Sequence, residues 1–330
     1  MQLATGYWPS AALLAANQLG IFQALDGNPA SASDLARQFD IPIRSVTMLL
    51  DACAALGLLD KQMSGETKNE FASYSNSDSA AAFLVPGRPG YLGDAIRWSA
   101  DQYALWGDLA NAVRANAPLI PPPHLGHDPD KTRTFVLGMH NRALGVARGV
   151  VPFLDFGGAS TLLDVGGGPG TYAQLLAQNY ADLRITLLDL PEIVEIAREL
   201  IADAKMGDRI ITRSGNAVTD SYGTAEFDAV LFSGVLHQMG PAIIQSMLAK
   251  AHKALKPGGR VLISDVMVTG NGTEPAFGAL FSLQMLLTSE AGGVFSVEQA
   301  EGWLGDAGFH TIVTNRLPPP LPYFILTGMA

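Results

Sequence analysis

The sequence is poor in cysteine and in basic residues, and both shortages limit what the protein does. Its single cysteine, Cys53, cannot form an internal disulfide, which fits a reducing compartment, and its apolar surroundings indicate a buried core residue. Lysine and arginine number only 21 against 31 acidic residues, so the net charge is −10. No run of basic residues occurs. We therefore expect no nucleic-acid partner, because phosphate binding requires concentrated positive charge.

The sequence also lacks the features of secreted and membrane proteins. No apolar run is long enough to span a bilayer, and no basic residue precedes the first apolar segment, since the first one is Arg37. We therefore predict a cytoplasmic protein without a membrane partner. At 330 residues and 48% hydrophobic composition, the chain can bury a sizeable core, and its length suggests about two domains.

The N-terminal third has the pattern of a winged helix. Apolar residues recur at helical spacing from Ser10 to about Leu59, with Ser33 as a candidate N-cap and a turn at residues 40–42. The polar segment 58–75 then alternates weakly, as a two-stranded wing would. Acidic residues outnumber basic ones in this region, which disfavours DNA binding. We therefore expect this mainly helical module to form a homodimer.

A proline-rich connector, residues 117–130, follows this module. It predicts a winged-helix-like dimerisation domain over residues 1–115 and a second domain over residues 116–330. His124 and His127 in the connector have no cysteine or histidine nearby in the sequence, so we predict no metal site there or elsewhere.

The second domain alternates short apolar runs with helical segments, which predicts an α/β fold with a mostly parallel sheet covered on both faces. The predicted strands are residues 161–165, 184–189, 209–214, 228–233 and 260–265, followed by two closing strands within 310–315 and 322–329. We expect the first five of these strands in the spatial order 3-2-1-4-5.

Four glycines and a proline follow the first predicted strand, in the segment LLDVGGGPGTY. In such sheets a ligand lies beyond the carboxyl ends of the strands, and glycines in the first turn let it approach the backbone. Thr171 replaces the last glycine of a dinucleotide fingerprint, and the ending of a nucleotide-phosphate loop is missing. Asp189 ends the second strand, where a carboxylate can bind both hydroxyls of a ribose. The segments Leu190-Pro191 and Gly215-Asn216-Ala217 supply an apolar surface and an amide for an adenine.

The ordered segments LLDVGGGPGTY, TLLDLP, SGNA, FDAVLFSGVLHQM and LKPGGRVLISD resemble the motifs of class I S-adenosylmethionine (SAM)-dependent methyltransferases. Nearly the whole chain is similar to the O-methyltransferase family that includes plant caffeic-acid-type and bacterial hydroxyneurosporene-type enzymes. The resemblance implies a Rossmann-like domain with a mostly parallel seven-stranded sheet, an N-terminal winged-helix dimerisation domain, SAM as cofactor and S-adenosylhomocysteine as product. The cofactor-binding residues that it implies are Gly166, Gly168, Asp189, Leu190, Asn216, Ala217 and Ser233.

The resemblance also implies that His237 is the general base and that Asp265 orients it. An apolar, water-poor cavity helps methyl transfer from a sulfonium, and the transfer does not require a metal. A phenol of pKa about 10 loses its proton to a free histidine of pKa about 6.5 at a cost of roughly 5 kcal/mol, which an orienting carboxylate reduces. We expect replacement of His237 to cost at least roughly tenfold in turnover.

The sequence departs from the family pattern at four places. Asn216 stands where an aspartate is common in the plant enzymes, and Ala217 stands where a bulky side chain often packs on adenine. The pair Gln238-Met239 replaces an acid and an aromatic residue, and no second orienting acid follows the Gly292-Gly293 pair.

We expect the acceptor pocket above the carboxyl edge of the sheet, with a lining that suits a flat aromatic or polyketide-like molecule. The predicted lining residues are Met139, Met239, Phe281 and Met285, with Arg142 as a candidate for binding an anionic group. The predicted function is O-methylation of a hydroxyl on a small molecule. N- or C-methylation, a SAM-binding protein without methyl transfer, and a SAM-sensing DNA-binding regulator stay open as alternatives.

Overall fold

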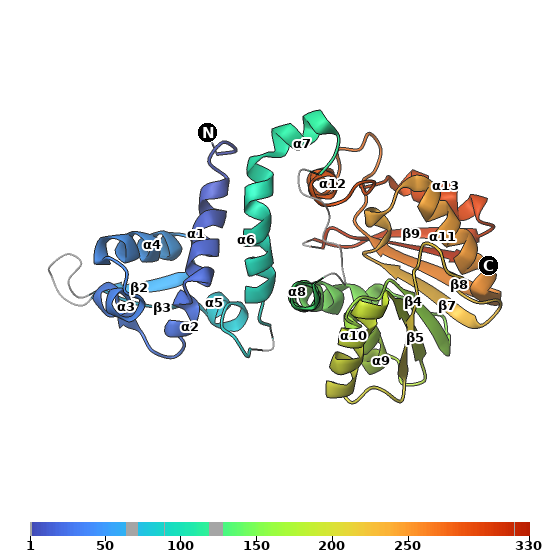
Figure 1. Cartoon of the computed structure of the whole chain (residues 1–330), viewed down its shortest axis with the longest axis horizontal. Coiled ribbons are helices and arrows are strands. Elements are labelled where there is room, and N and C mark those ends of the chain that lie inside the picture. Colours follow the sequence, from blue (N-terminus) through green and yellow to red (C-terminus); the bar gives the residue numbers. More distant parts are fainter. Residues whose placement is uncertain (1, 64–71, 89, 119–127, 320) are drawn as a thin grey trace. The chain divides into compact units, whose positions relative to one another are not determined.

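The computed structural model describes residues 2–63, 72–88, 90–118, 128–319 and 321–330. The chain forms two compact units, Met1–Ala104 and Leu105–Ala330 (Figure 1). The predicted domain boundary after residue 115 stays a prediction, and His124 and His127 lie outside the described residues. None of the helices in the described part of the chain is both long and apolar enough to cross a membrane.

The first unit is mainly helical and contains the elements of the predicted winged helix, with two helices on either side of the turn at residues 40–42 and two strands after them. Its elements are α1 (Tyr7–Gln18), α2 (Ile21–Ala24), β1 (Ala30–Ser31), α3 (Ala32–Phe39), α4 (Ile43–Ala55), β2 (Leu59–Met63), β3 (Ala72–Asn76), α5 (Asp78–Phe83) and most of α6 (Gly93–Gly107). Strands β2 and β3 pair antiparallel, and β1 joins β3. Cys53 is fully buried in the core of this unit, and burial raises the pKa of its thiol to about 11, so it is a structural residue.

The cap of α3 corrects one prediction. Its N-cap is Ser31 rather than Ser33: the Ser31 hydroxyl accepts the Asp34 N–H at 3.2 Å, and the Asp34 carboxylate accepts the Ser31 N–H at 3.2 Å. Only Ser31 stands three residues before an acid that completes this reciprocal capping box.

The second unit is built on a seven-stranded sheet. Its strands are β4 (Thr161–Val165), β5 (Arg184–Asp189), β6 (Ile210–Ser214), β7 (Phe227–Ser233), β8 (Leu255–Asp265), β9 (His310–Arg316) and β10 (Phe324–Met329). They lie in the order β6-β5-β4-β7-β8-β10-β9; β10 runs antiparallel to both of its neighbours, β8 and β9, and the pairs from β6 to β8 are parallel. The first five strands therefore have the predicted order. Strand β8 begins five residues before the predicted start, because Leu255 pairs with Phe227 ahead of an irregularity in the register.

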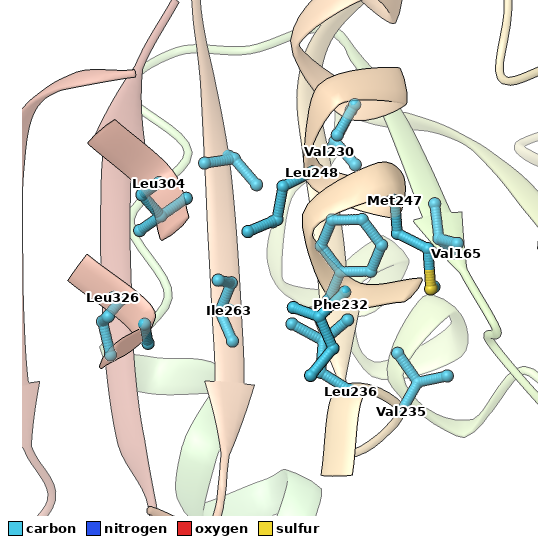
Figure 2. Close-up of a cluster of buried hydrophobic side chains, with 14 of the residues drawn as sticks. Val165, Val230, Phe232, Val235, Leu236, Met247, Leu248, Ile263, Leu304 and Leu326 are labelled. Atoms are coloured by element: carbon cyan, nitrogen blue, oxygen red, sulfur yellow. The ribbon is translucent and has the colours of Figure 1, made fainter. Parts of the chain in front are cut away.

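Helices cover both faces of the sheet, as Figure 1 shows. The covering helices are α8 (Pro129–Val150), α9 (Thr171–Asn179), α10 (Pro191–Asp203), α11 (Pro241–Ala254) and α13 (Val297–Asp306). The unit also contains α7 (Leu109–Ala115) and α12 (Ala276–Thr288), which contact each other, and 3-10 turns at Val151–Phe153 and Leu236–Gln238. Alternate residues of β7 point to opposite faces. Val230 and Phe232 pack with α11 and α13 in the cluster of Figure 2, whereas Ala229 and Leu231 pack with α8, α9 and α10.

The parallel strands bring five side chains to one edge of the sheet. The carboxyl ends of β4 to β8 are Val165, Asp189, Ser214, Ser233 and Asp265. Residues from four separate segments of the sequence thus lie at the same edge of the sheet as the glycine-rich turn.

Candidate active site

The glycine-rich turn after β4 favours glycine through its backbone conformation and, at some positions, through lack of room for a side chain. Gly166, Gly168 and Gly170 have φ of 67°, 56° and 78°, a left-handed backbone that favours glycine. A Cβ on Gly166 would lie 2.7 Å from a methyl carbon of Val235. The turn therefore presents bare main chain at the carboxyl edge of the sheet.

Asp189 fastens this turn to the end of β5. Its Oδ2 accepts the Gly168 N–H at 2.7 Å, and its Oδ1 accepts the Leu190 N–H at 2.8 Å. Burial raises the pKa of this carboxyl, and the two backbone donors oppose the shift. A carboxylate has about four acceptor positions, so Asp189 can accept further bonds from a ligand's hydroxyls.

Asp164 is a second acid beneath the turn, fully buried, and was not predicted as a site residue. It is 1% exposed, and neither carboxylate oxygen has a hydrogen-bond partner among the described residues. Burial, together with the charge of Asp189, raises its pKa to about 7. A carboxyl buried without a partner is costly, and a cationic ligand nearby would reduce that cost. The sequence does contain a signal for this residue, because Asp164 is an acid within the apolar run LLDV.

The loop after β6 lies beside Asp189, because the Gly215 N–H donates to the Asp189 carbonyl at 2.9 Å. Asn216 is exposed, and its Oδ1 accepts the Val218 N–H at 2.8 Å. The Asn216 Oδ1 atom is therefore used within the turn. The Nδ2 group of the same amide is left for the predicted contact with adenine. Ala217 packs against the sheet's hydrophobic cluster.

His237 and Asp265 form a close pair. The imidazole Nδ1 lies 2.6 Å from Asp265 Oδ1, and the His237 backbone N–H donates to Asp265 Oδ2 at 3.3 Å. Asp265 is fully buried and also accepts the Val266 N–H at 2.8 Å. With the imidazole proton on Nδ1, facing the carboxylate, the lone pair is on Nε2.

The segment around Gly292 holds the His237 backbone. The Gly293 N–H donates to the His237 carbonyl at 2.9 Å, and a Cβ on Gly292 would lie 2.7 Å from the same oxygen. The family's Gly-Gly pair thus contacts the histidine here, although no acid follows it.

Phe281 also contacts His237. The two rings meet edge to face with centroids 5.0 Å apart, and Phe277 stacks on Phe281 at 5.9 Å. The structure therefore brings one of the predicted acceptor-lining residues to the imidazole.

The remaining predicted residues lie on several elements. Ser233 ends β7 opposite Ser264 of β8. Met239 is half-buried against the sheet's hydrophobic cluster, and Met285 is buried within α12. Met139 is half-buried on α8.

Helix α8 also approaches the glycine-rich turn, through His140, which was not predicted as a site residue. His140 Nδ1 lies 2.8 Å from the Thr171 hydroxyl, directly after the turn, and burial lowers the pKa of His140. The charge of Arg142, on the same helix, lowers the pKa of Tyr323, which burial raises more strongly.

This edge of the sheet combines bare backbone, two buried acids and a histidine with an oriented proton. Comparison with known proteins identifies the arrangement. The O-methyltransferase domain model matches residues 106–310, and the O-methyltransferase dimerisation domain model matches residues 1–86.

Three similar proteins illustrate the match. A 3-hydroxy-5-methyl-1-naphthoate 3-O-methyltransferase of Streptomyces sahachiroi is 34% identical over 99% of this chain and 93% of its own. The tetracenomycin polyketide synthesis 8-O-methyl transferase TcmO of Streptomyces glaucescens is 31% identical over 97% and 93%. Human N-acetylserotonin methyltransferase in complex with SAM shares the fold, with a TM-score of 0.88 and 23% identity over 99% and 95% of the two chains. The predicted resemblance is therefore confirmed, and the chain belongs to the O-methyltransferase family, whose SAM-dependent members methylate a hydroxyl of a small molecule.

Proposed function

We propose that this SAM-dependent O-methyltransferase methylates a hydroxyl group on an aromatic or polyketide-like molecule, with His237 as the general base. The observation that carries the proposal is the 2.6 Å contact between His237 Nδ1 and Asp265 Oδ1. It orients the imidazole and leaves Nε2 to accept the hydroxyl proton. The buried carboxylate of Asp265 then stabilises the imidazolium that forms.

The residues at the carboxyl edge fit the cofactor. When bound, SAM supplies an electrophilic methyl group on a positively charged sulfur. The bare turn at Gly166 and Gly168 allows close approach, and the buried Asp164 and half-buried Asp189 favour a cation. Asp189 has acceptor positions left for the ribose. Leu190, Asn216, Ala217 and Ser233 complete the proposed cofactor pocket.

Aromatic and thioether side chains support the acceptor class. Phe281 touches the catalytic imidazole and is stacked by Phe277, so a flat ring beside His237 would meet aromatic surfaces. We assign Met139, Met239 and Met285 to the remaining lining. The naphthoate- and tetracenomycin-modifying relatives act on molecules of the same kind.

The proposal is tested with methyl-labelled SAM and a panel of phenols, hydroxyquinones and aromatic amines. We expect label on the oxygen of at least one hydroxylated aromatic compound, detected and located by mass spectrometry. Label on amine nitrogen or on carbon alone would favour N- or C-methylation. No transfer to any compound, despite SAM binding, would favour a SAM-binding protein without methyl transfer.

Replacing Asp189 with asparagine should weaken SAM binding by at least about tenfold, the effect of losing one hydrogen bond to a charged acceptor. Isothermal titration calorimetry measures the Kd for SAM. The matched control is Asp203→Asn, which removes the same charge from the exposed end of α10. Equal affinities of the two variants would contradict the ribose-binding role of Asp189.

We further propose a cytoplasmic homodimer assembled through residues 1–115. The first unit exposes several large apolar side chains, which a second copy would cover. They include Leu3, Tyr7, Trp8, Met48 and Tyr103. The acidic balance of this region argues against a nucleic-acid partner. Light scattering tests the assembly, and a stable monomer at micromolar concentration would contradict it.

A further inference from the structure

Lys250 on α11 holds the loop that follows β6. Its ammonium group donates to three backbone carbonyls of this loop, those of Ala217 at 2.6 Å, Val218 at 2.8 Å and Asp220 at 3.1 Å. An ammonium group has three donors, so all of them bind one short stretch of main chain.

The partners of Lys250 differ from those of other lysines. Lys61 and Lys256 each contact a carboxylate, at 2.7 Å and 2.8 Å. Within the described ranges, no carboxylate oxygen lies within 4.0 Å of the Lys250 ammonium group, and burial lowers its pKa. Holding a partly buried cation with neutral carbonyls is costly, and the compensation is an ordered loop.

The three contacts between Lys250 and this loop are called the clamp below. The clamp has a rigid base and a second attachment. Met247 and Leu248, on the turn before Lys250, are fully buried in the cluster of Figure 2, which fixes α11 to the sheet. The Tyr222 hydroxyl donates to the Ala217 carbonyl at 2.7 Å, and the ammonium group lies 4.6 Å from the centre of the Tyr222 ring. One carbonyl oxygen is thereby held by both a cation and a phenol.

The clamped loop is the one proposed to meet the adenine. Its first residue, Gly215, is bonded to the backbone of Asp189, the proposed ribose ligand, and Asn216 and Ala217 follow directly. We propose that Lys250 is a positioning residue for the cofactor: it fixes the main chain from Ala217 to Asp220 so that the adenine end of the pocket is preformed. This inference rests on the cofactor pocket proposed above. Preforming a loop improves affinity because less ordering accompanies binding.

The test compares Lys250→Met with Lys253→Met, an exposed lysine on the same helix. Calorimetry measures the Kd for SAM, S-adenosylhomocysteine and 5′-methylthioadenosine, which keeps the adenosine but lacks the amino acid. We expect Lys250→Met to weaken all three by a similar factor, on the order of tenfold, whereas Lys253→Met binds like the unsubstituted protein. Lys250→Arg, which restores charged donors, should recover most of the affinity.

Unchanged affinities in a folded Lys250→Met variant would overturn the inference. A loss for SAM that spares methylthioadenosine would overturn it too, because the clamp would not act at the adenine end. If Lys250→Met does not fold, Tyr222→Phe removes the second attachment, and wild-type affinity for all three ligands in that variant would reject the clamp.

The variant Asn216→Ala distinguishes a wrong role for Lys250 from a wrong location of the proposed adenine site. Weaker SAM binding in Asn216→Ala, beside normal binding in Lys250→Met, rejects the clamp alone. Normal binding in both variants rejects the clamp together with the adenine site.

Discussion

Replacing His237 with glutamine should lower kcat by about a hundredfold or more, within the range for loss of a general base, while the Kd for SAM changes little. Glutamine can keep a hydrogen bond to Asp265 but cannot accept a proton at the position of Nε2. The rate is measured in single turnovers with saturating SAM and a phenolic acceptor. Calorimetry on the same variant measures SAM affinity.

Two comparisons sharpen this prediction. His310→Gln changes an exposed histidine on β9 and should leave kcat unaltered. Raising the pH toward about 10, where a phenol ionises without help, should partly restore the rate of His237→Gln. A His237→Gln variant with near wild-type turnover at neutral pH would remove histidine from the proton transfer.

The variant Asp265→Asn should also reduce kcat by roughly a hundredfold. Asp265 accepts hydrogen bonds from His237 Nδ1, from the His237 backbone and from Val266, and its buried position keeps water from replacing them. An asparagine NH₂ group facing Nδ1 favours the tautomer with its proton on Nε2, which cannot act as the base. Single-turnover rates measure the effect.

The double variant tests whether the two residues act as one unit. Because Asp265 is expected to work through His237, His237→Gln with Asp265→Asn should be about as slow as the slower single variant. Losses that multiply would show that Asp265 has an independent role. A normal rate in Asp265→Asn would mean that Gly293 and Phe281 suffice to orient the imidazole.

The strands and the glycine-rich turn were predictable because their signals are local. Near-continuous apolar runs place β4 and β5 at the predicted residues, and a left-handed backbone at Gly166 and Gly168 calls for glycine in any fold. The early start of β8 was missed because it depends on Leu255 meeting Phe227 across the sheet. The cap of α3 was misplaced by two residues because it depends on which serine Asp34 can reach.

The site was predictable in part, through the resemblance to the family. The pairing of His237 with Asp265 followed from the order of two neighbouring strands. Asp164 was passed over because its importance depends on complete burial without a partner. Lys250 carries no sequence signal, since its role consists of three carbonyl contacts across 30 to 33 residues of chain.

By itself the sequence determined the strand–helix alternation, the glycine turn and the family, because backbone sterics and apolar periodicity act between near neighbours in the chain. Only the tertiary structure decided which polar atoms of distant segments meet and which carboxyls lose water. Those outcomes depend on how α8, α11 and α12 pack around the sheet, and the electrostatics of the site follow from that packing.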